Sequence, residues 1–483
     1  MTIAGVVRES PDARGFDPWV RVFDSSQTPV DDAALETLQA EVRGADLAGP
    51  AVALPDFHQE PNMEAPCSIA VATRDSIRPT VSNASVNCGM ALIALDAEPP
   101  DTRAVTRFYR RVQEEMPYPA GYRAQLQRRD VLLAASLGAW FSVERFGFDP
   151  AELDRVEEGG RLEVERHGGA DRLRRELPLI TVLLSRLQFA TVGPSNHFIE
   201  LQQVERLLDP GAGRLLGVQE GQLTLQYHAG GGVLTGLVGR MFGRRTDFPR
   251  RHRAIMAVQK PLHHLASARS LAEFGLRRML YFSGGCPPVS RSTSEGQRML
   301  LANAAAMNYG FAFRLAVYSK LRTLAAELLG ARDSRLVVDS PHDSLYEEEM
   351  NGESVVVHRY KACRAYPAWR RPDHPIFGAV GQPLLLPGTN RTSSYLCVAD
   401  VGAGDALYSA CHGTGSIIAD FEARGLSGPD PHGRTTLRFR YGGCAPEEVV
   451  HLDDRGIDEA LDILTRHRIL RPVARLRPLA VLT

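Results

Sequence analysis

The alternation of apolar and polar positions divides the chain into strand-rich and helix-rich stretches. From Ala51 to Leu95, short apolar runs such as AVALPD, CSIAVAT and MALIALDA are broken by Pro, Asn, Ser and Gly, which predicts strands joined by loops. The same texture returns in LQFATVGPSNHFIELQQV and GQLTLQYHAGGGV, and strands are expected to dominate from Ser334 onward. These stretches predict a strand-rich core.

Helical spacing of apolar residues occupies the stretches between these strands. It covers about residues 103–187 and the basic stretch from Leu237 to Leu280. The run EGQRMLLANAAAMNYGFAFRLAVYSKLRTLAAELLG predicts one long Ala- and Leu-rich helix that ends at Gly330. Shorter helices are expected around Asp31 to Val42 and near Gly456 to His467.

The domain organisation that follows is a single large α+β domain. No internal repeat and no low-complexity linker divides the 483 residues. Residues 1–50 are expected to form a variable leader and residues 51–483 one strand-rich domain, with helical insertions at about 103–187 and 237–330.

Composition and charge narrow the class of function. The net charge is −1, so a nucleic-acid partner needs a local basic patch such as GRRTDFPRRHR, from Gly243 to Arg253, which is equally typical of a solvated surface strip. No apolar run is long enough to cross a membrane and no secretory signal begins the chain, so we expect a cytoplasmic protein with no membrane partner. An enzyme with a lysine nucleophile would have only Lys260, Lys320 and Lys361 as candidates, and none of them stands in a KxDG-like motif.

Candidate chemistry gathers where strand-like runs end. The seven cysteines include no CxxC pair, which argues against a disulfide framework or a four-cysteine zinc site but leaves a lone metal-ligating cysteine open. Loop side chains at such ends are Cys88, His197, His228, His342 and His412. A single loop histidine is usually structural. One thiolate with several imidazoles, however, is a donor set for Mn, Zn, Co or Ni rather than for Mg or Ca.

Eight blocks in the sequence now carry a family resemblance. They are LPDFH, NCGM, GPSNHFIE, STSEGQRMLLANAAAMNYGFAFR, VVHRYKACRAYP, GQPLLLPGTNRTSSY, CHGTGS and ARLRPLAVL. In this order they resemble the motifs of RtcB-type RNA ligases, from about Leu54 to the C-terminus. The resemblance implies a single large RtcB-like domain.

The resemblance also implies an activity and its residues. The family joins an RNA 3′-phosphate or 2′,3′-cyclic phosphate to a 5′-hydroxyl, as in tRNA splicing and RNA repair, with GTP and divalent metal, usually two manganese ions; an activating protein is a further partner that the resemblance leaves open. By motif position the metal ligands would be Cys88, His197, His228 and His342, the guanylated nucleophile His412, and the nucleotide contacts Asn196, Glu200, Ser394 and Tyr395. Asn196 and Glu200 would reach one ligand from a helical turn or a tight loop.

Five positions depart from the family pattern. Ser85 stands where the family has a metal-binding Asp, and Asp343 where it has Asn. Gly232 and Ser416 replace arginines, and Thr483 replaces a lysine. Because these changes thin the positive charge around the phosphates, two alternatives stay open: a paralogue with only metal-dependent phosphodiesterase or nucleotidyl-transfer activity, and a non-catalytic RNA-end binding protein.

Overall fold

The structure is a computed structural model that describes residues 18–61, 63–82, 85–119, 121, 124–194, 196–242, 250–282, 286–443 and 445–483. The predicted basic patch at 243–253 lies mostly outside the described residues, as do the first seventeen residues of the expected leader.

A nine-stranded sheet forms the centre of the described chain. Its order is β13-β14-β18-β6-β7-β5-β9; in addition, β16 pairs with β18, and β17 pairs with β16. The strands are β5 (Gly89–Leu95), β6 (Phe198–Leu207), β7 (Leu223–Ala229), β9 (Ser334–Pro341), β13 (Pro383–Leu386), β14 (Ser394–Ala399), β16 (Thr435–Phe439), β17 (Glu447–Val450) and β18 (Leu470–Leu482). The strand stretches expected from the sequence are therefore confirmed.

Strand β5 shows why this sheet is buried on both faces. Ala91 and Ile93 face the helical layer, whereas Met90 and Leu92 belong to a separate apolar cluster on the opposite face. A strand covered on both sides needs apolar residues at every position, and the run GMALIAL supplies them.

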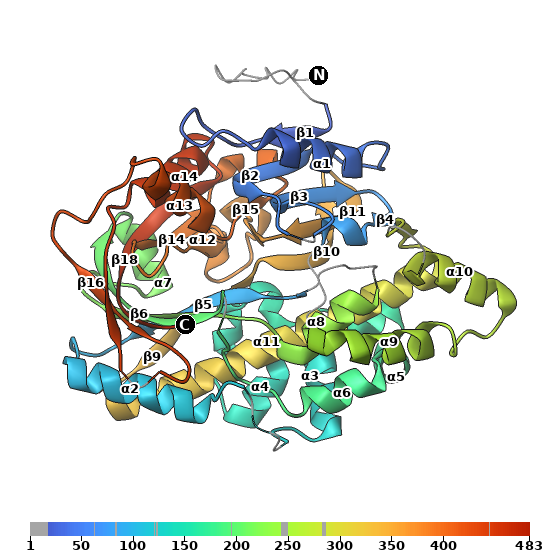
Figure 1. The fold of residues 1–483 in the computed structure, drawn as a ribbon, viewed down its shortest axis with the longest axis horizontal. Coiled ribbons are helices and arrows are strands. Elements are labelled where there is room, and N and C mark those ends of the chain that lie inside the picture. Colours follow the sequence, from blue (N-terminus) through green and yellow to red (C-terminus); the bar gives the residue numbers. More distant parts are fainter. Residues whose placement is uncertain are drawn as a thin grey trace.

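A five-stranded sheet lies beside the first, in the order β1-β2-β3-β11-β10. It consists of β1 (Val20–Val22), β2 (Ala51–His58), β3 (Cys67–Thr73), β10 (Asp343–Met350) and β11 (Glu353–Tyr360). Two strand pairs complete the pattern, β4 (Ser76–Ile77) with β8 (Val289–Ser290) and β12 (Ala362–Arg364) with β15 (Ser409–Cys411). Figure 1 shows the five-stranded sheet above the nine-stranded one, on the side away from the large helical layer.

The helical layer occupies the lower part of Figure 1 and surrounds one long helix, α11. The helices of the described chain, of which α1, α12, α13 and α14 lie outside this layer in the upper part of Figure 1, are α1 (Asp32–Val42), α2 (Thr102–Glu115), α3 (Arg128–Leu137), α4 (Ala139–Phe146), α5 (Gly169–Glu176), α6 (Leu179–Ser185), α7 (Pro210–Leu216), α8 (Gly232–Met241), α9 (Arg250–His264), α10 (Leu271–Phe282), α11 (Ser294–Leu328), α12 (Phe377–Val380), α13 (Gly415–Ala423) and α14 (Arg455–Arg466). Helix α11 is apolar around most of its circumference because it is buried on nearly every side. Gly330 follows its end with φ +68°, which confirms the predicted stop.

The helical expectation fails locally between Pro150 and His167. This stretch forms three short 3-10 turns, at Pro150–Arg155, Glu157–Gly160 and Val164–His167. Glu158 and Gly159 have φ angles of +55° and +59°, so an α-helix cannot pass through them.

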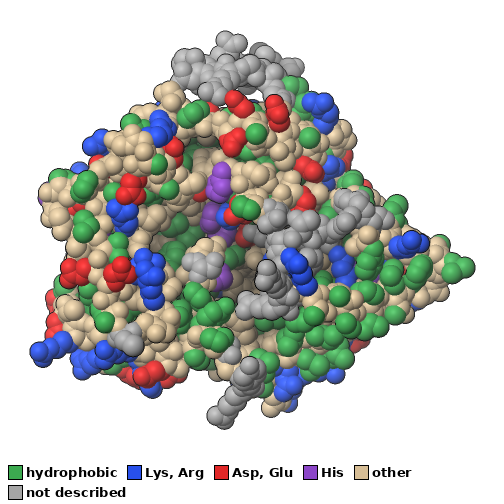
Figure 2. Space-filling view, in the orientation of Figure 1, with side chains coloured by type: hydrophobic (Ala, Val, Ile, Leu, Met, Phe, Trp, Pro, Cys, Tyr) green, Lys and Arg blue, Asp and Glu red, His purple; other side chains and the backbone are tan. Residues whose placement is uncertain are grey.

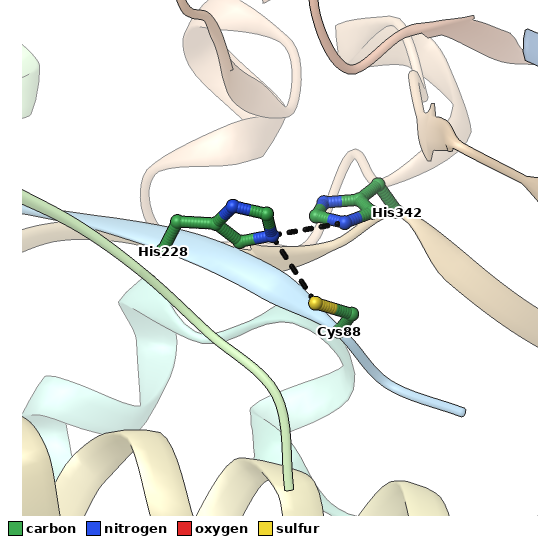
Figure 3. Close-up of side chains that lie close together, drawn as sticks. All are labelled: Cys88, His228 and His342. Carbon is green, nitrogen blue, oxygen red and sulfur yellow. Dashed lines mark hydrogen bonds between the residues drawn. The ribbon is translucent and has the colours of Figure 1, made fainter. Parts of the chain in front are cut away.

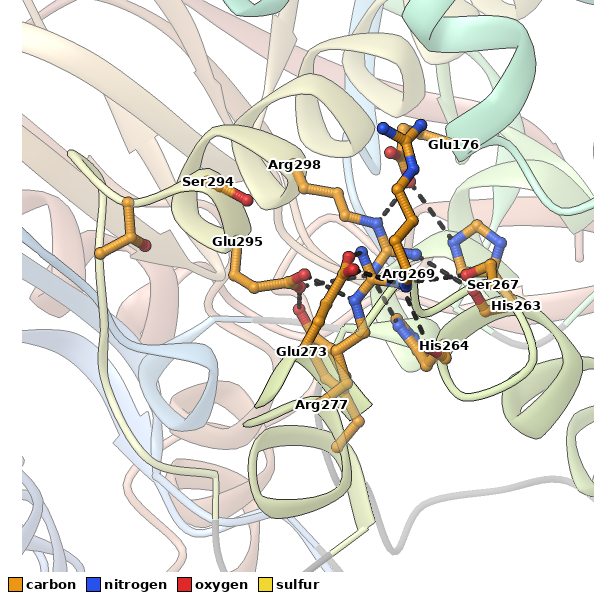
Figure 4. Close-up of polar contacts among 12 residues, drawn as sticks. Glu176, His263, His264, Ser267, Arg269, Glu273, Arg277, Ser294, Glu295 and Arg298 are labelled. Atoms are coloured by element: carbon orange, nitrogen blue, oxygen red, sulfur yellow. Dashed lines mark hydrogen bonds and ion pairs between the residues drawn. The ribbon is translucent and has the colours of Figure 1, made fainter. Parts of the chain in front are cut away.

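A buried network of charges fastens the α9–α10 hairpin to α11. Glu295 accepts hydrogen bonds from Arg277 Nε at 2.6 Å and from Arg298 Nη1 at 3.2 Å, and Arg298 Nε is paired with Glu176 of α5. Figure 4 shows these side chains pointing toward one another from separate helices. Because each buried charge has an opposite partner, the network fixes how the helices meet.

These elements confirm the α+β class and the strand-rich core with helical insertions. Of the helices in the described ranges, none combines the length and the apolar character needed to cross a membrane.

Candidate metal centre and nucleophile

Four of the predicted side chains lie at one end of the strands β9, β5, β7 and β6. Cys88 immediately precedes β5 and His342 immediately follows β9, while Gly89 of β5 pairs with Pro341 of β9. His228 of β7 pairs with Phe198, the first residue of β6, so His197 comes to the same end. Hydrogen-bonded neighbours in a sheet thus bring together residues that are far apart in sequence.

The donor atoms of this group lie close together. Cys88 Sγ is 3.1 Å from His228 Nε2 and 3.4 Å from His197 Nε2, and His228 Nε2 is 3.3 Å from His342 Nε2. Figure 3 shows the imidazoles of His228 and His342 and the Cys88 thiol turned toward one another. Figure 2 shows histidine side chains in a hollow near the centre of this face.

Helix α11 packs against the loop that carries Cys88 and forms a hydrogen bond with it. Arg314 donates from Nη1 to the Asn87 carbonyl oxygen at 2.6 Å, and its Nη2 donates to Asp339 at 2.6 Å. A Cβ on Gly89 would lie 2.9 Å from the Arg314 guanidinium, and a Cβ on Gly310 would lie 2.8 Å from Asn87. The two glycines therefore let the loop and the helix approach closely enough to fix the thiol.

The imidazoles of the group are neutral and oriented. His228 Nδ1 donates to the Asn196 carbonyl oxygen at 2.6 Å, so the lone pair of Nε2 is available to bind a metal ion. Burial lowers the pKa of His197 to about 4, and burial together with the neighbouring histidines holds the pKa values of His228 and His342 well below the usual range. Neutral imidazoles are the form that binds metal ions.

The geometry of Cys88, His228 and His342 fits one transition-metal ion. Their ligand atoms all lie within 4.8 Å of one another. In a tetrahedral site, nitrogen and sulfur donors at ordinary bond lengths stand roughly 3.3–3.6 Å apart, close to the separations found here. The buried Nδ1 of His342 has no hydrogen-bond partner within the described part of the chain. This group could hold a metal, and a thiol with imidazoles favours a transition ion.

His412 lies beside this group at the end of β15. Its ring centroid is 4.2 Å from that of His342. The pairing of Ala362 with Cys411 places it next to Lys361, and His412 Nδ1 donates to the Lys361 carbonyl oxygen at 3.1 Å. Burial lowers the pKa of His412 to about 3. The ring is therefore neutral at pH 7, with an unprotonated Nε2 that can act as a nucleophile.

Ser416, where the family resemblance predicts an arginine, is paired with a carboxylate. Asp56 accepts hydrogen bonds from the backbone N–H groups of Ser416 at 3.0 Å and Ile417 at 3.2 Å, and from the Ser416 hydroxyl. An aspartate at the first turn of α13 satisfies free backbone donors and suits the helix dipole. This position therefore carries an uncharged side chain whose polar groups are already bonded to Asp56.

Of the residues predicted to contact the nucleotide, one lies in a loop and three lie in strands. Asn196 is exposed in the loop before β6, but Glu200 lies inside that strand, so the expected helical turn or tight loop is wrong for Glu200. Burial raises the pKa of Glu200 to about 8, and its Oε1 accepts from Gln202 Nε2 at 2.6 Å. Ser394 Oγ accepts from the Gly388 N–H at 3.1 Å, and Tyr395 donates to Asp458 at 2.6 Å.

Two departures from the family pattern lie at the metal group. The Ser85 carbonyl oxygen accepts from the Cys88 N–H at 3.1 Å, so Ser85 belongs to the turn that carries the thiol. Asp343 Oδ2 is 3.9 Å from His342 Nε2, which brings a carboxylate close to the group.

Three supporting residues are missed by motif reasoning. Asp56 stands within LPDFH, Arg314 is a lone charge in the apolar run GFAFR, and Lys361 is one of only three lysines. A lone arginine in a buried helix signals a buried ion pair. The contacts of Asp56 and Lys361 depend on tertiary structure and give no such signal.

The fold and the site together define an α+β protein whose strand ends carry a potential transition-metal centre with a histidine beside it. A family model described as tRNA-splicing ligase RtcB matches residues 42–483, so the chain belongs to this family.

Curated relatives agree with the family. The tRNA-splicing ligase RtcB of Pyrococcus abyssi is 28% identical over 423 residues, which cover 82% of this chain and 42% of that protein. The RNA-splicing ligase RtcB of Mycobacterium tuberculosis is 30% identical over 358 residues, or 71% of this chain and 74% of that one. The tRNA-splicing ligase RtcB of Thermococcus kodakarensis is 27% identical over 459 residues, 89% of this chain and 86% of that one. The chain spans less than half the length of the Pyrococcus relatives that it matches.

Proposed function

We propose that this chain is a GTP- and metal-dependent RNA ligase that joins a 3′-phosphate or 2′,3′-cyclic phosphate end to a 5′-hydroxyl end. Family membership supports the ligase chemistry and the RNA substrate. The observation that carries the proposal is the position of His412: its Nδ1–H donates to the Lys361 carbonyl oxygen, and its ring centroid lies 4.2 Å from that of His342 in the candidate metal group.

The residues then divide the work as follows. His412 Nε2 attacks the α-phosphorus of GTP, a P–N bond forms, and pyrophosphate leaves. The GMP is transferred to the RNA 3′-phosphate, and the 5′-hydroxyl displaces it as the new phosphodiester bond forms. Cys88, His197, His228 and His342 would hold Mn²⁺ or a similar divalent ion, two ions in all, and the bound metal would neutralise phosphate charge.

The remaining assignments belong to the same proposal. Asn196, exposed beside His197, would contact the nucleotide phosphates. Glu200 would contact guanine, for which its raised pKa leaves a proton to donate at pH 7. Ser394 and Tyr395 would shape the nucleotide loop. The cytoplasmic location and an activating protein stay predictions.

The test is incubation with α-labelled GTP and MnCl₂, followed by denaturing electrophoresis. We expect a labelled adduct in the wild type and in His432→Ala, which removes an exposed histidine, and none in His412→Ala. An adduct that survives in His412→Ala would refute the assigned nucleophile. Cyclic-phosphate opening without adduct would favour the phosphodiesterase alternative, and RNA retention on a filter with neither would favour the RNA-end binding protein.

A further inference from the structure

Lys361 has a backbone conformation that its side chain makes costly. It forms the link between β11 and β12 with φ +48°, in the left-handed region. Glycine adopts this region freely, whereas a residue with a Cβ pays a strain energy there that folded proteins keep mainly at functional sites. The strain raises the question of why a lysine occupies the link.

The main-chain contacts of Lys361 do not explain its side chain. Its N–H donates to Asp343 Oδ1 at 2.9 Å, and its carbonyl oxygen accepts from His412 Nδ1 at 3.1 Å. A glycine would make both hydrogen bonds without strain. The reason for lysine must therefore lie in the ammonium group.

The Lys361 ammonium group forms an ion pair with a carboxylate and remains partly exposed to solvent. Lys361 Nζ is paired with Glu60, which also accepts a hydrogen bond from the Tyr360 hydroxyl. The side chains of Lys361 and Glu60 keep 19% and 26% of their surface exposed. A partly exposed pair of this kind can exchange one anion for another at modest cost, because solvent screens both charges.

A reaction of His412 with a phosphate requires a positive charge close to the site. The Ser416 position carries no charge, and its backbone and hydroxyl are bonded to Asp56. After burial, the positive charge of Lys361 is the next influence that lowers the pKa of His412. Attack on a phosphate builds negative charge that a nearby cation must offset.

We propose that Lys361 is a phosphate-binding residue of this site, whose ammonium exchanges Glu60 for the phosphate oxygens of the nucleotide or RNA end. It supplies positive charge to a site in which the Ser416 position has none. The assignment rests on the proposed function, since it presumes a phosphate substrate at His412. Glu60 is then the resting partner of the ammonium, and Tyr360 holds Glu60 in place.

The binding of inorganic tripolyphosphate tests the assignment without guanine or catalysis. Isothermal titration in low salt with MnCl₂ should show binding that weakens about 10- to 100-fold in Lys361→Met, the loss expected for one charge-assisted contact. Lys361→Arg should recover most of the affinity, and Glu60→Gln should bind more tightly because it frees the ammonium. The matched control is Lys320→Met, which removes a lysine bonded to the carbonyl oxygens of Glu115 and Ala190 and should bind as the wild type does.

A stability arm separates phosphate binding from a structural role. Lys361→Gly relieves the strained φ and should keep the melting temperature of the wild type while losing affinity as Lys361→Met does. Asn351→Gly, at φ +53° in the β10–β11 turn, is the control for strain relief alone and should keep full affinity. Equal tripolyphosphate affinity in Lys361→Met and wild type, or no binding by the wild type, would overturn the assignment.

The same titration keeps this assignment distinct from the ligase proposal. His412→Ala should bind tripolyphosphate but form no guanylate adduct. Lysine-dependent binding without any adduct in the wild type would therefore refute the nucleophile and leave Lys361 standing. A guanylate adduct in the wild type, combined with unchanged tripolyphosphate binding in Lys361→Met, would refute the role of Lys361 and leave His412 as the nucleophile.

Discussion

Buried imidazoles recur in this protein as rings pinned at Nδ1 by a backbone carbonyl. His228 and His412 use this contact to present Nε2 to the site. His358 uses it away from the site: its Nδ1 donates to the Val71 carbonyl oxygen at 3.2 Å, and its Nε2 accepts from the Arg78 N–H at 2.9 Å. Because both nitrogens are satisfied only in the neutral ring, protonation must break one of these contacts.

We therefore expect His358 to make stability fall in mild acid. Burial lowers its pKa to about 4 in the folded chain, from 6.5 in the unfolded one. The neutral ring stabilises the fold above pH 6.5, and this contribution is lost as the pH falls toward 4, at up to about 1.4 kcal/mol per pH unit. Urea unfolding of metal-free protein at pH 6.5, 5.5 and 4.5 measures the slope.

His358→Gln, whose amide can replace both contacts, should make that slope shallower by the contribution of one imidazole, because the other buried histidines still contribute. His432→Gln is the control at an exposed position and should leave the slope as it is in the wild type. A slope unchanged in His358→Gln would contradict the assignment.

Loop positions after strand-like runs, together with the order of the motifs, named the five side chains that the structure gathers at the strand ends. What it could not give is the environment of each. The proposed role of Lys361 rests on a φ angle and on a carboxylate 301 residues away in sequence, and Asp56 reaches Ser416 across 360 residues. Such contacts exist only after the sheets have packed.

Helix α11 acts as the platform of the site. Gly310 lets Asn87 rest on the helix, and Arg314 of the same helix binds the Asn87 carbonyl oxygen. The thiol of Cys88 follows directly on this anchored residue. A change on the helix surface should therefore reach the metal group without touching a ligand.

Gly310→Ala tests this coupling. Its Cβ would lie 2.8 to 2.9 Å from Asn87, whose backbone is fixed at both ends, so we expect a loss of about 1–3 kcal/mol in unfolding free energy and weaker metal binding. Gly275→Ala is the matched control: this glycine of α10 has no atom within 4 Å of a built Cβ, and alanine should stabilise the helix by about 0.5–1 kcal/mol. Both are measured by urea unfolding and by metal titration. Unimpaired metal binding in Gly310→Ala would show that α11 does not control the site.

The sequence predicted the elements far better than their assembly. Largely apolar runs identified β5 and α11 because β5 is buried on both faces and α11 on nearly every side. The stretch 150–167 was misjudged as helix, since its apolar spacing is helical but Glu158 adopts a left-handed φ that only the folded structure imposes. Strand order within each sheet carries no local signal.

At the scale of the whole molecule, a metal ion bound by Cys88, His228 and His342 would link parts of the chain that are distant in sequence. Cys88, His228 and His342 come from three neighbouring strands of the central sheet. The unfolded chain does not hold these donors together, so an ion that binds them stabilises the folded state.

Thermal unfolding with and without metal checks this. MnCl₂ or ZnCl₂ at about 100 times the dissociation constant should add about 2.7 kcal/mol of stability over EDTA-treated protein, seen as a higher melting temperature. Cys88→Ala should lose most of this increase, whereas Cys397→Ala, which removes a buried thiol of β14, should retain it. An equal increase in Cys88→Ala would remove the thiol from the site.

The position of β18 has a consequence for the order of events during synthesis. Residues 470–482 lie between β14 and β6, so this strand joins the half of the central sheet that carries the metal group to the half formed by β13 and β14. A chain that emerges from the ribosome N-terminus first cannot close this sheet until β18 has been made. Until then the edges of β6 and β14 stay open to other strands. We therefore expect chaperones to protect nascent chains of this protein until residues 470–482 have been made.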